Sequence, residues 1–453
     1  MIIEQLPYEP THQQVQLVAA LARFYCRPAM VDDPVFILAG YAGTGKSSMV
    51  GAMVRAIQSM KWPVVLLAPT GRAAKVLSLF AGANAYTIHR FIYRLSPTQG
   101  LTLASNPLKN ALFVVDEASM IGEDNSLLSD LVHYVYSGTG CRMLLLGDTA
   151  QLPPVGLTES PAMSPQVLRS FGLKVTRAQL TATVRQHSSS GVLHNATWLR
   201  HAMLKDPLPS PQLTVTPFND IKVLESDDLE DALTSAYRAD DGERDSILIT
   251  RSNRRATAYN LEIRNRILGR EEMITRGELL MVAKNNYHWT KEIPSIPFIA
   301  NGDIATVEQI YDSELRYGLL FADAKIHLTY RDITIDCKLM LDTLTSDTAA
   351  MPTERIAQLQ QDVLAANSLG ASLSLTAQRQ ILRSDPYFNA LQVKYAYAVT
   401  CHKAQGGQWP NVFVDMAGIP PESQGMDFYR WLYTAITRTT DRLYLISPTV
   451  KVL

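Results

Sequence analysis

Short runs of apolar residues alternate with helix-length segments through the first half of the chain. Continuous apolar runs predict strands that are buried on both faces, and the longer segments between them predict the helices that cover those faces. This alternation is typical of an α/β domain with a parallel sheet. The predicted strands are Pro34–Gly40, Val64–Pro69, Ala111–Glu117 and Cys141–Asp148.

The same pattern returns in the second half of the chain, so we expect two α/β cores. Its predicted strands are Asp245–Ser252, Val412–Met416 and Arg442–Ile446. The proline-rich stretch Leu204–Pro217 holds no sustained period and is predicted to be a linker.

An insertion is predicted to interrupt the second core between about Gly277 and Gln392. Its first part, to about Cys337, alternates apolar and polar residues and contains the turn signal Asn301-Gly302, which predicts a small β-domain. Its later part, about Thr353 to Ser384, predicts helices. The expected organisation is therefore residues 1–200 for the first core, 201–276 for the linker and the start of the second core, 277–392 for the insertion, and 393–453 for the rest of the second core.

Length and charge limit the possible classes. The 453 residues exceed the roughly 250–300 residues that one hydrophobic core serves, which agrees with two or three domains. The formal net charge is −1, with 42 basic and 43 acidic residues. Bulk charge therefore gives no sign of nucleic-acid binding, and any such binding requires basic residues gathered in a channel.

The cysteines predict a reduced, cytoplasmic protein. The four cysteines lie far apart and lack zinc-type spacing, so we expect mostly buried thiols. The first residues lack the features of a signal peptide, and no apolar run approaches the roughly 18 residues of a membrane span. The cysteines are Cys26, Cys141, Cys337 and Cys401.

The segment GYAGTGKS matches a phosphate-binding loop between a predicted strand and a predicted helix. Its glycines let backbone N–H groups surround phosphates, and the helix start adds a positive dipole end. The alternative is a chance glycine-rich turn. In the functional reading Lys46 reaches the β- and γ-phosphates and Ser47 binds magnesium. The loop's other predicted ligand-binding residues are Gly40, Gly43, Thr44 and Gly45.

Two further strand ends carry candidate chemistry. Asp116 and Glu117 close an apolar strand, so that one carboxylate could bind magnesium and the other could activate a water molecule. The alternative is a pair of helix-capping acids. Gln151 follows the next apolar strand and could hydrogen-bond the γ-phosphate or the attacking water. Arg185 and Arg438 are candidates for stabilising transition-state charge, although a single arginine is more often a solvated surface group.

In order along the chain, these segments resemble superfamily 1 helicases of the RecD and Dda branch. The resemblance implies two RecA-like cores, use of ATP and Mg²⁺, and an SH3-like fold for the inserted β-domain. It implies that Arg185 and Arg438 act as arginine fingers and that Gln14 reads adenine, for which Gln13 or Gln16 could substitute. The matching segments are the phosphate loop, APTGRAAKVL (68–77), TIHRF (87–91), DEASM (116–120), GDTAQLPPVG (147–156), VRQ (184–186), TCHKAQGGQW (400–409) and YTAITR (433–438).

The resemblance also implies contacts with single-stranded DNA. Small and hydroxyl residues at strand ends let a phosphate backbone approach, and basic residues neutralise it. For His89 the alternative is a structural histidine. The implied contacts are Pro69, Thr70, Gly71, Arg72, Thr87, His89, Thr400, His402 and Lys403.

The expected activity is an ATP-dependent DNA helicase that moves 5′ to 3′ on single-stranded DNA as a monomer. Residues 93–109 are predicted to form a hairpin that acts as a pin at the duplex junction, with a surface loop as the alternative. Three other readings stay open: a regulatory ATPase that grips DNA without separating strands, a helicase subunit of a nuclease complex, and an RNA substrate.

Overall fold

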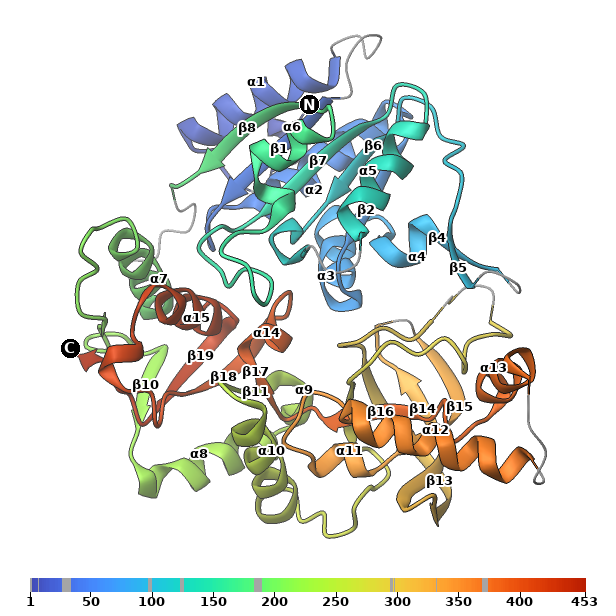
Figure 1. Cartoon of the computed structure of the whole chain (residues 1–453). Helices are drawn as coiled ribbons and strands as arrows, with labels where there is room; N and C mark the ends of the chain where they lie inside the picture. Colours follow the sequence, from blue (N-terminus) through green and yellow to red (C-terminus); the bar gives the residue numbers. More distant parts are fainter. Residues whose placement is uncertain are drawn as a thin grey trace.

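The structure is a computed structural model of the chain and describes residues 2–6, 8–26, 34–96, 100–122, 126–182, 190–293, 296, 298–330, 332–368 and 374–453. Three bodies are visible in Figure 1: a first α/β core at the top, a second α/β core at the lower left, and a β-barrel at the lower right. No helix of the described residues has the length and apolar character needed to cross a membrane.

The first core is a parallel six-stranded sheet in the order β3-β2-β6-β7-β1-β8. The central strands are buried on both faces, and alternate residues of β1 enter two separate hydrophobic clusters, one on each face of the sheet. The strands are β1 (Pro34–Gly40), β2 (Val64–Ala68), β3 (Ala85–Thr87), β6 (Leu112–Val115), β7 (Arg142–Gly147) and β8 (Lys174–Leu180). The helices are α1 (His12–Cys26), α2 (Lys46–Ser59), α3 (Gly71–Ala81), α4 (Ile88–Ile92), α5 (Leu127–Ser137) and α6 (Pro165–Ser170).

The second core is a parallel five-stranded sheet in the order β10-β19-β18-β11-β17. Its strands are β10 (Ile221–Leu224), β11 (Ser246–Thr250), β17 (Ala398–Thr400), β18 (Trp409–Asp415) and β19 (Thr439–Ile446), and the short strands β9 (Gln212–Leu213) and β20 (Lys451–Val452) pair beside it. Its helices are α7 (Gly191–Ala202), α8 (Ser226–Tyr237), α9 (Gly242–Asp245), α10 (Asn253–Glu262), α14 (Cys401–Ala404) and α15 (Met426–Ile436).

One predicted boundary between the cores is wrong. The predicted first core extends to residue 200, but α7 packs against α15 and contributes Val192, Ala196 and Leu199 to the hydrophobic core of the second. Among the described residues, the first core therefore ends by Ala182 and the second begins at Ser190, the N-cap of α7.

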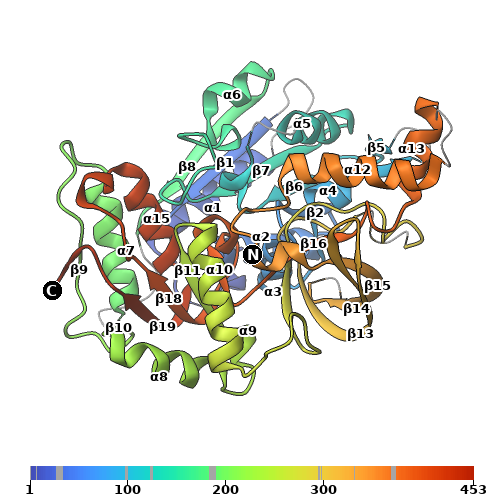
Figure 2. The same cartoon turned by 60° about the horizontal axis from the view of Figure 1, so that its bottom comes forward.

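The insertion is a closed five-stranded β-barrel, in the order β12-β13-β14-β15-β16, at the predicted position. Helices α12 and α13 form the predicted helical extension and lie over one end of the barrel (Figure 2). Helix α12 packs there through Leu359 and Val363, and α13 through Ile381 and Leu382. The strands are β12 (Leu279–Val282), β13 (Ile304–Arg316), β14 (Leu319–Leu328), β15 (Ile333–Met340) and β16 (Leu391–Tyr395), and the helices are α11 (Asp342–Thr345), α12 (Thr353–Ser368) and α13 (Leu375–Ser384).

The barrel is firmly joined to the second core. Both bodies contribute to one continuous hydrophobic cluster. At their junction Arg264 forms a buried ion pair with Glu278 at 2.9 Å, and the Tyr397 hydroxyl donates to the same carboxylate at 2.7 Å. A buried charge pair tolerates little change in geometry, so we expect the barrel and the second core to move together.

Candidate nucleotide site and nucleic-acid interface

The predicted phosphate loop lies at the carboxyl end of β1, and α2 begins at Lys46. Gly43 and Gly45 have φ values of 75° and 79°, a left-handed conformation that glycine adopts without steric cost. The Lys46 ammonium group donates to the carbonyls of Gly40 and Tyr41, which holds it above the loop. Ser47 follows in the first turn of α2, and Thr44, within the loop, is fully buried. This is the geometry of a phosphate cradle at a helix start.

Gln14 supports this loop from inside the protein. Its side chain is fully buried, donates to the Thr44 carbonyl at 3.1 Å and to the Tyr8 hydroxyl at 3.3 Å, and accepts from the Thr11 N–H. The expected contact with adenine is therefore not available to this side chain, because its amide is used within the protein. The neighbouring Gln13 is half-buried, and its amide donates to the Thr181 hydroxyl.

Asp116 and Glu117 follow β6 at the same edge of the sheet. Burial raises the pKa of Asp116, and the Lys46 ammonium group acts in the opposite direction. Burial, followed by the adjacent Asp116 carboxylate, raises the pKa of Glu117 to about 7, while Arg438 and Lys46 oppose the shift. Glu117 also has a left-handed φ of 51°, which is strained for a residue other than glycine and is typical of functional sites. A carboxylate with a pKa near 7 is suited to accepting a proton at neutral pH.

Gln151 lies in the turn after β7, and the second core holds this turn. The Leu152 N–H donates to the Thr434 hydroxyl at 2.8 Å, and the Gln405 amide donates to the Leu152 carbonyl at 2.7 Å. The Gln151 Oε1 atom is buried and has no hydrogen-bond partner within the described residues. A buried amide oxygen without a partner costs free energy unless a ligand or water satisfies it, so Gln151 is suited to meet a group that enters the cleft.

Tyr433 of α15 makes a second contact across the cleft. Its hydroxyl accepts from the Ala42 N–H of the phosphate loop at 2.8 Å and donates to Asp148 Oδ2 at 2.8 Å. The motif that contains Tyr433 was identified from the sequence, but this contact depends on how the two cores meet.

Of the two predicted arginine fingers, only Arg438 lies within the described residues. Arg185 lies outside the described residues. Arg438 is buried at the end of α15, and its guanidinium donates to the Thr434 carbonyl at 3.0 Å and to the Gly407 carbonyl at 3.2 Å. Its positive charge lowers the pKa of Glu117. Arg438 is thus held within the second core and acts electrostatically on a first-core carboxylate.

Arg200 of α7 is a further basic residue at this site that the sequence analysis missed. Its guanidinium lies 4.8 Å from the ring centre of Tyr41 in the phosphate loop, and the side chain is 7% exposed. Its Nε atom is buried without a hydrogen-bond partner in the described part of the chain. No motif marks this residue, since Arg200 lies in an ordinary amphipathic segment.

These residues fit a nucleoside triphosphate with a divalent cation. The backbone cradle and the Lys46 ammonium group suit phosphates, and the unpartnered Gln151 oxygen suits a water molecule that donates to it. Ser47 and Asp116 are oxygen ligands of the kind that Mg²⁺ prefers, and Mg²⁺ takes most of its other ligands from phosphates and water. The described residues contain no cluster of three or more acidic, histidine or cysteine ligands, so this pair would need the phosphates to complete a metal site.

The predicted DNA contacts in the first core lie at the carboxyl ends of β2 and β3, but several of them are engaged. The Thr70 and Thr87 hydroxyls cap α3 and α4 by accepting from backbone N–H groups. Arg72 stacks 4.1 Å from the ring centre of Trp409, and its Nε donates to the Tyr330 hydroxyl of the barrel. Arg72 therefore links all three bodies and does not lie in an open groove. Pro69 and Gly71, also at the end of β2, are half-buried.

The remaining predicted contacts also face the barrel. The His89 ring packs edge-on against Phe298 at 5.6 Å, and burial lowers the pKa of His89. The Lys403 ammonium group donates to Asn301 Oδ1, and burial lowers the pKa of Lys403 to about 8. Thr400 and Lys403 are half-buried and His402 is exposed, at and just after the end of β17.

The predicted hairpin is present as two antiparallel strands, β4 (Tyr93–Ser96) and β5 (Gly100–Leu103). Its turn, at residues 97–99, lies outside the described residues. In Figure 1 the hairpin projects from the first core toward the barrel.

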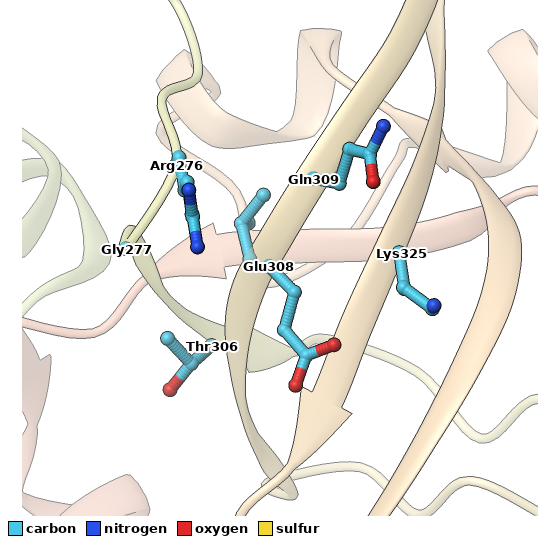
Figure 3. A pocket seen from close by; sticks show the side chains of 7 residues that line it. Arg276, Gly277, Thr306, Glu308, Gln309 and Lys325 are labelled. Carbon is cyan, nitrogen blue, oxygen red and sulfur yellow. The ribbon is translucent and has the colours of Figure 1, made fainter.

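A separate cavity of about 520 Å³ lies on the outer surface of the barrel (Figure 3). None of the predicted nucleotide or DNA residues borders it, so its position does not support a role in the chemistry of the cleft. It is lined by Arg276, Gly277, Thr306, Val307, Glu308, Gln309 and Lys325.

Comparison with known proteins is consistent with these two sites. Residues 14–206 match the AAA domain family, and residues 395–446 match the UvrD-like helicase C-terminal domain family. The chain is 34% identical over 167 residues to the ATP-dependent RecD2 DNA helicase of Deinococcus radiodurans, an alignment that covers 36% of this chain and 21% of the relative. It is 31% identical over 134 residues to the ATP-dependent DNA helicase Dda of Enterobacteria phage T4, which covers 27% of this chain and 29% of the relative.

These matches confirm the resemblance to the RecD and Dda branch that the motifs indicated. The chain spans about a fifth of the length of RecD2 and less than a third of Dda in these alignments. A crystal structure of Pif1 helicase from Bacteroides aligns with a TM-score of 0.49 at 16% identity and covers 98% of this chain and 94% of that one.

Proposed function

We propose that this chain, whose motifs place it with the RecD- and Dda-like superfamily 1 helicases, is an ATP-dependent DNA helicase that translocates 5′ to 3′ on single-stranded DNA. The observation that carries the proposal is the composite nucleotide site. The phosphate loop and catalytic carboxylates come from the first core, while Tyr433, Thr434 and Gln405 from the second core hold the phosphate loop and the Gln151 turn. A site completed only by closure of two bodies couples nucleotide turnover to motion.

Each residue of the site has a defined role in this proposal. Lys46 and the loop amides bind the β- and γ-phosphates, and Glu117 accepts a proton from the attacking water. Gln151 orients that water, and Arg438 stabilises charge on the transferred group as the cleft closes. Ser47 and Asp116 would hold Mg²⁺, which when bound neutralises phosphate charge. The other predicted finger, Arg185, keeps its proposed role from the sequence resemblance.

The proposed DNA path runs along the strand ends where the two cores face the barrel. Lys403 and Arg72 supply positive charge there, and the half-buried Thr400 lies at the end of β17, where a phosphate backbone can approach. Thr87 is buried and its hydroxyl caps α4, so its proposed contact requires that cap to open. Because both cationic side chains now contact the barrel, DNA entry requires those contacts to rearrange. We propose that the hairpin of β4 and β5 acts as the pin that divides the duplex. We also propose that the protein works as a monomer in the cytoplasm.

The test is unwinding of a short duplex that carries either a 5′ or a 3′ single-stranded tail, with ATP hydrolysis followed in parallel. Wild type should unwind only the 5′-tailed substrate, and Lys46→Ala should hydrolyse no ATP and unwind neither substrate. DNA-stimulated hydrolysis without unwinding of either duplex would refute the helicase and support a regulatory ATPase. Unwinding of RNA in preference to DNA would correct the substrate.

A further inference from the structure

One tyrosine hydroxyl joins two separate parts of the nucleotide site across the cleft. Tyr433 comes from α15 of the second core and is 1% exposed. Its hydroxyl oxygen accepts the Ala42 N–H of the phosphate loop, and its proton goes to the buried carboxylate of Asp148. Both partners belong to the first core, at the ends of β1 and β7 respectively.

We propose that Tyr433 is a positioning residue that makes ATP hydrolysis depend on closure of the two cores. The inference rests on the proposed function and adds a residue to it. In the closed cleft a single hydroxyl fixes the phosphate loop and the turn that carries Gln151. In an open cleft both first-core groups lose this partner together.

The connection from Tyr433 to Gln151 runs through Asp148. While Oδ2 of Asp148 accepts from Tyr433, its Oδ1 accepts the Ala150 N–H at 3.0 Å, and the Gln151 N–H is bonded to the Asp148 carbonyl at 3.3 Å. The carboxylate therefore shapes the turn from one side and meets the second core from the other. A fixed turn holds Gln151 in a single orientation, and preorganised polar groups are the main source of catalysis in phosphoryl transfer.

The far side of the same turn is held by the residue next to Tyr433. The Thr434 hydroxyl accepts the Leu152 N–H, and Gln405 donates to the Leu152 carbonyl. Gln151 thus lies between two points that both depend on the second core. Its own unpartnered Oε1 is left for the reacting groups.

The hydroxyl is suited to a constant role as a donor. Burial, followed by the Asp148 carboxylate, raises the pKa of Tyr433 well above its usual value of 10. The phenol therefore keeps its proton throughout the pH range in which enzymes of this kind are assayed, and Tyr433 is not itself a proton-transfer group.

Tyr429 provides a matched control one helical turn earlier. It is also fully buried on α15, and its hydroxyl donates to the Pro209 carbonyl within the second core. Tyr429→Phe removes a buried tyrosine hydroxyl from the same helix without touching the cleft. It separates a general loss of packing or hydrogen bonding from a loss of positioning.

The experiment compares DNA-stimulated ATP hydrolysis in wild type, Tyr433→Phe and Tyr429→Phe, together with binding of a fluorescent ATP analogue and thermal unfolding. A hydrogen bond to a charged acceptor is strong enough that we expect kcat of Tyr433→Phe to fall by about 10- to 100-fold. Nucleotide affinity should change by no more than about threefold, and Tyr429→Phe should keep the wild-type kcat. Equal rates in the two phenylalanine variants, beside an active wild type, would overturn the inference.

A second variant tests the hydrogen bond between Tyr433 and Asp148 by changing its acceptor. Asp148→Asn keeps the shape of the side chain and should also lower kcat. If Tyr433 acts through Asp148, the double variant Tyr433→Phe/Asp148→Asn loses no more activity than the more damaged single variant. Multiplicative losses would overturn the proposed connection. A wild-type chain that hydrolyses no ATP would instead refute the proposed function, so the two failures are distinguishable.

Discussion

Replacing Glu117 with glutamine should remove activity and stabilise the fold at the same time. Its carboxyl group has a pKa raised from 4.5 to about 7, first by burial and then by Asp116. Because the native state binds this proton more tightly than the unfolded chain, stability falls as the pH rises through this window and stays lower above pH 7. A tenfold change in proton affinity is worth about 1.4 kcal/mol, so the ionised carboxylate costs about 3 kcal/mol at pH 8.

Glutamine has the same shape and no charge, so Glu117→Gln should not pay this cost. We expect the free energy of unfolding to rise by about 2–3 kcal/mol at pH 8, and by only about 1 kcal/mol at pH 5, where the wild-type group is protonated in the native state. Loss of the proton acceptor should lower kcat for ATP hydrolysis by at least about 100-fold.

The assay is urea unfolding at both pH values, in EDTA and without nucleotide, so that no cation neutralises the carboxylates. Glu422→Gln, at an exposed position, is the control and should change the unfolding free energy little at either pH. A stabilisation of Glu117→Gln that is the same at pH 5 and pH 8, or a destabilisation at pH 8, would refute the electrostatic reasoning.

Three further predictions concern Arg200 at the nucleotide site, Lys403 on the proposed DNA path, and the buried ion pair of Arg264 and Glu278. Arg200→Lys keeps the charge but loses the planar stack on Tyr41 and should lower kcat for ATP hydrolysis by about tenfold, since the two groups are not interchangeable at a stacked site; an unchanged rate would remove Arg200 from the nucleotide site. The pKa of Lys403 is lowered to about 8 by burial, so single-stranded DNA affinity, measured by fluorescence anisotropy, should fall about three- to tenfold from pH 7 to pH 9, and Lys403→Arg should flatten this dependence; an equal pH dependence in both proteins would contradict this. Glu278→Gln leaves the Arg264 charge buried beside the barrel and should cost about 3–5 kcal/mol in urea unfolding, whereas Glu230→Gln, in an exposed pair, should cost less than about 1 kcal/mol; similar costs would argue against the buried joint.

The central strands of both cores were predictable because they are buried on both faces and leave continuous apolar runs. Edge strand β8 (Lys174–Leu180) was missed, since most of its side chains are exposed or half-buried and no such run marks it. The helix α7 was assigned to the wrong core. Helical periodicity shows that a segment has a buried face, but the sequence alone does not show which sheet it covers.

The residues of the candidate site likewise fall into those that local sequence indicates and those that only the folded structure shows. The phosphate loop, the acidic pair and Gln151 each follow a strand directly, so local sequence indicates their chemistry. The roles of Arg200 and Tyr433 depend on contacts across the cleft, between residues far apart in the chain. For the same reason the sequence suggested an open DNA contact at Arg72, whereas the guanidinium is stacked between bodies.

Among the described residues the first core ends by Ala182 and the second begins at Ser190, and this has a consequence for how the protein could be divided. Residues up to 182 contain one complete sheet, and residues from 190 contain the other sheet with its barrel. Expressing the two parts as separate chains would turn closure of the cleft into a bimolecular encounter, because the effective concentration that a covalent link provides would be lost. The specific activity of the two separate parts would fall as the protein is diluted. That of the intact chain would not depend on its concentration.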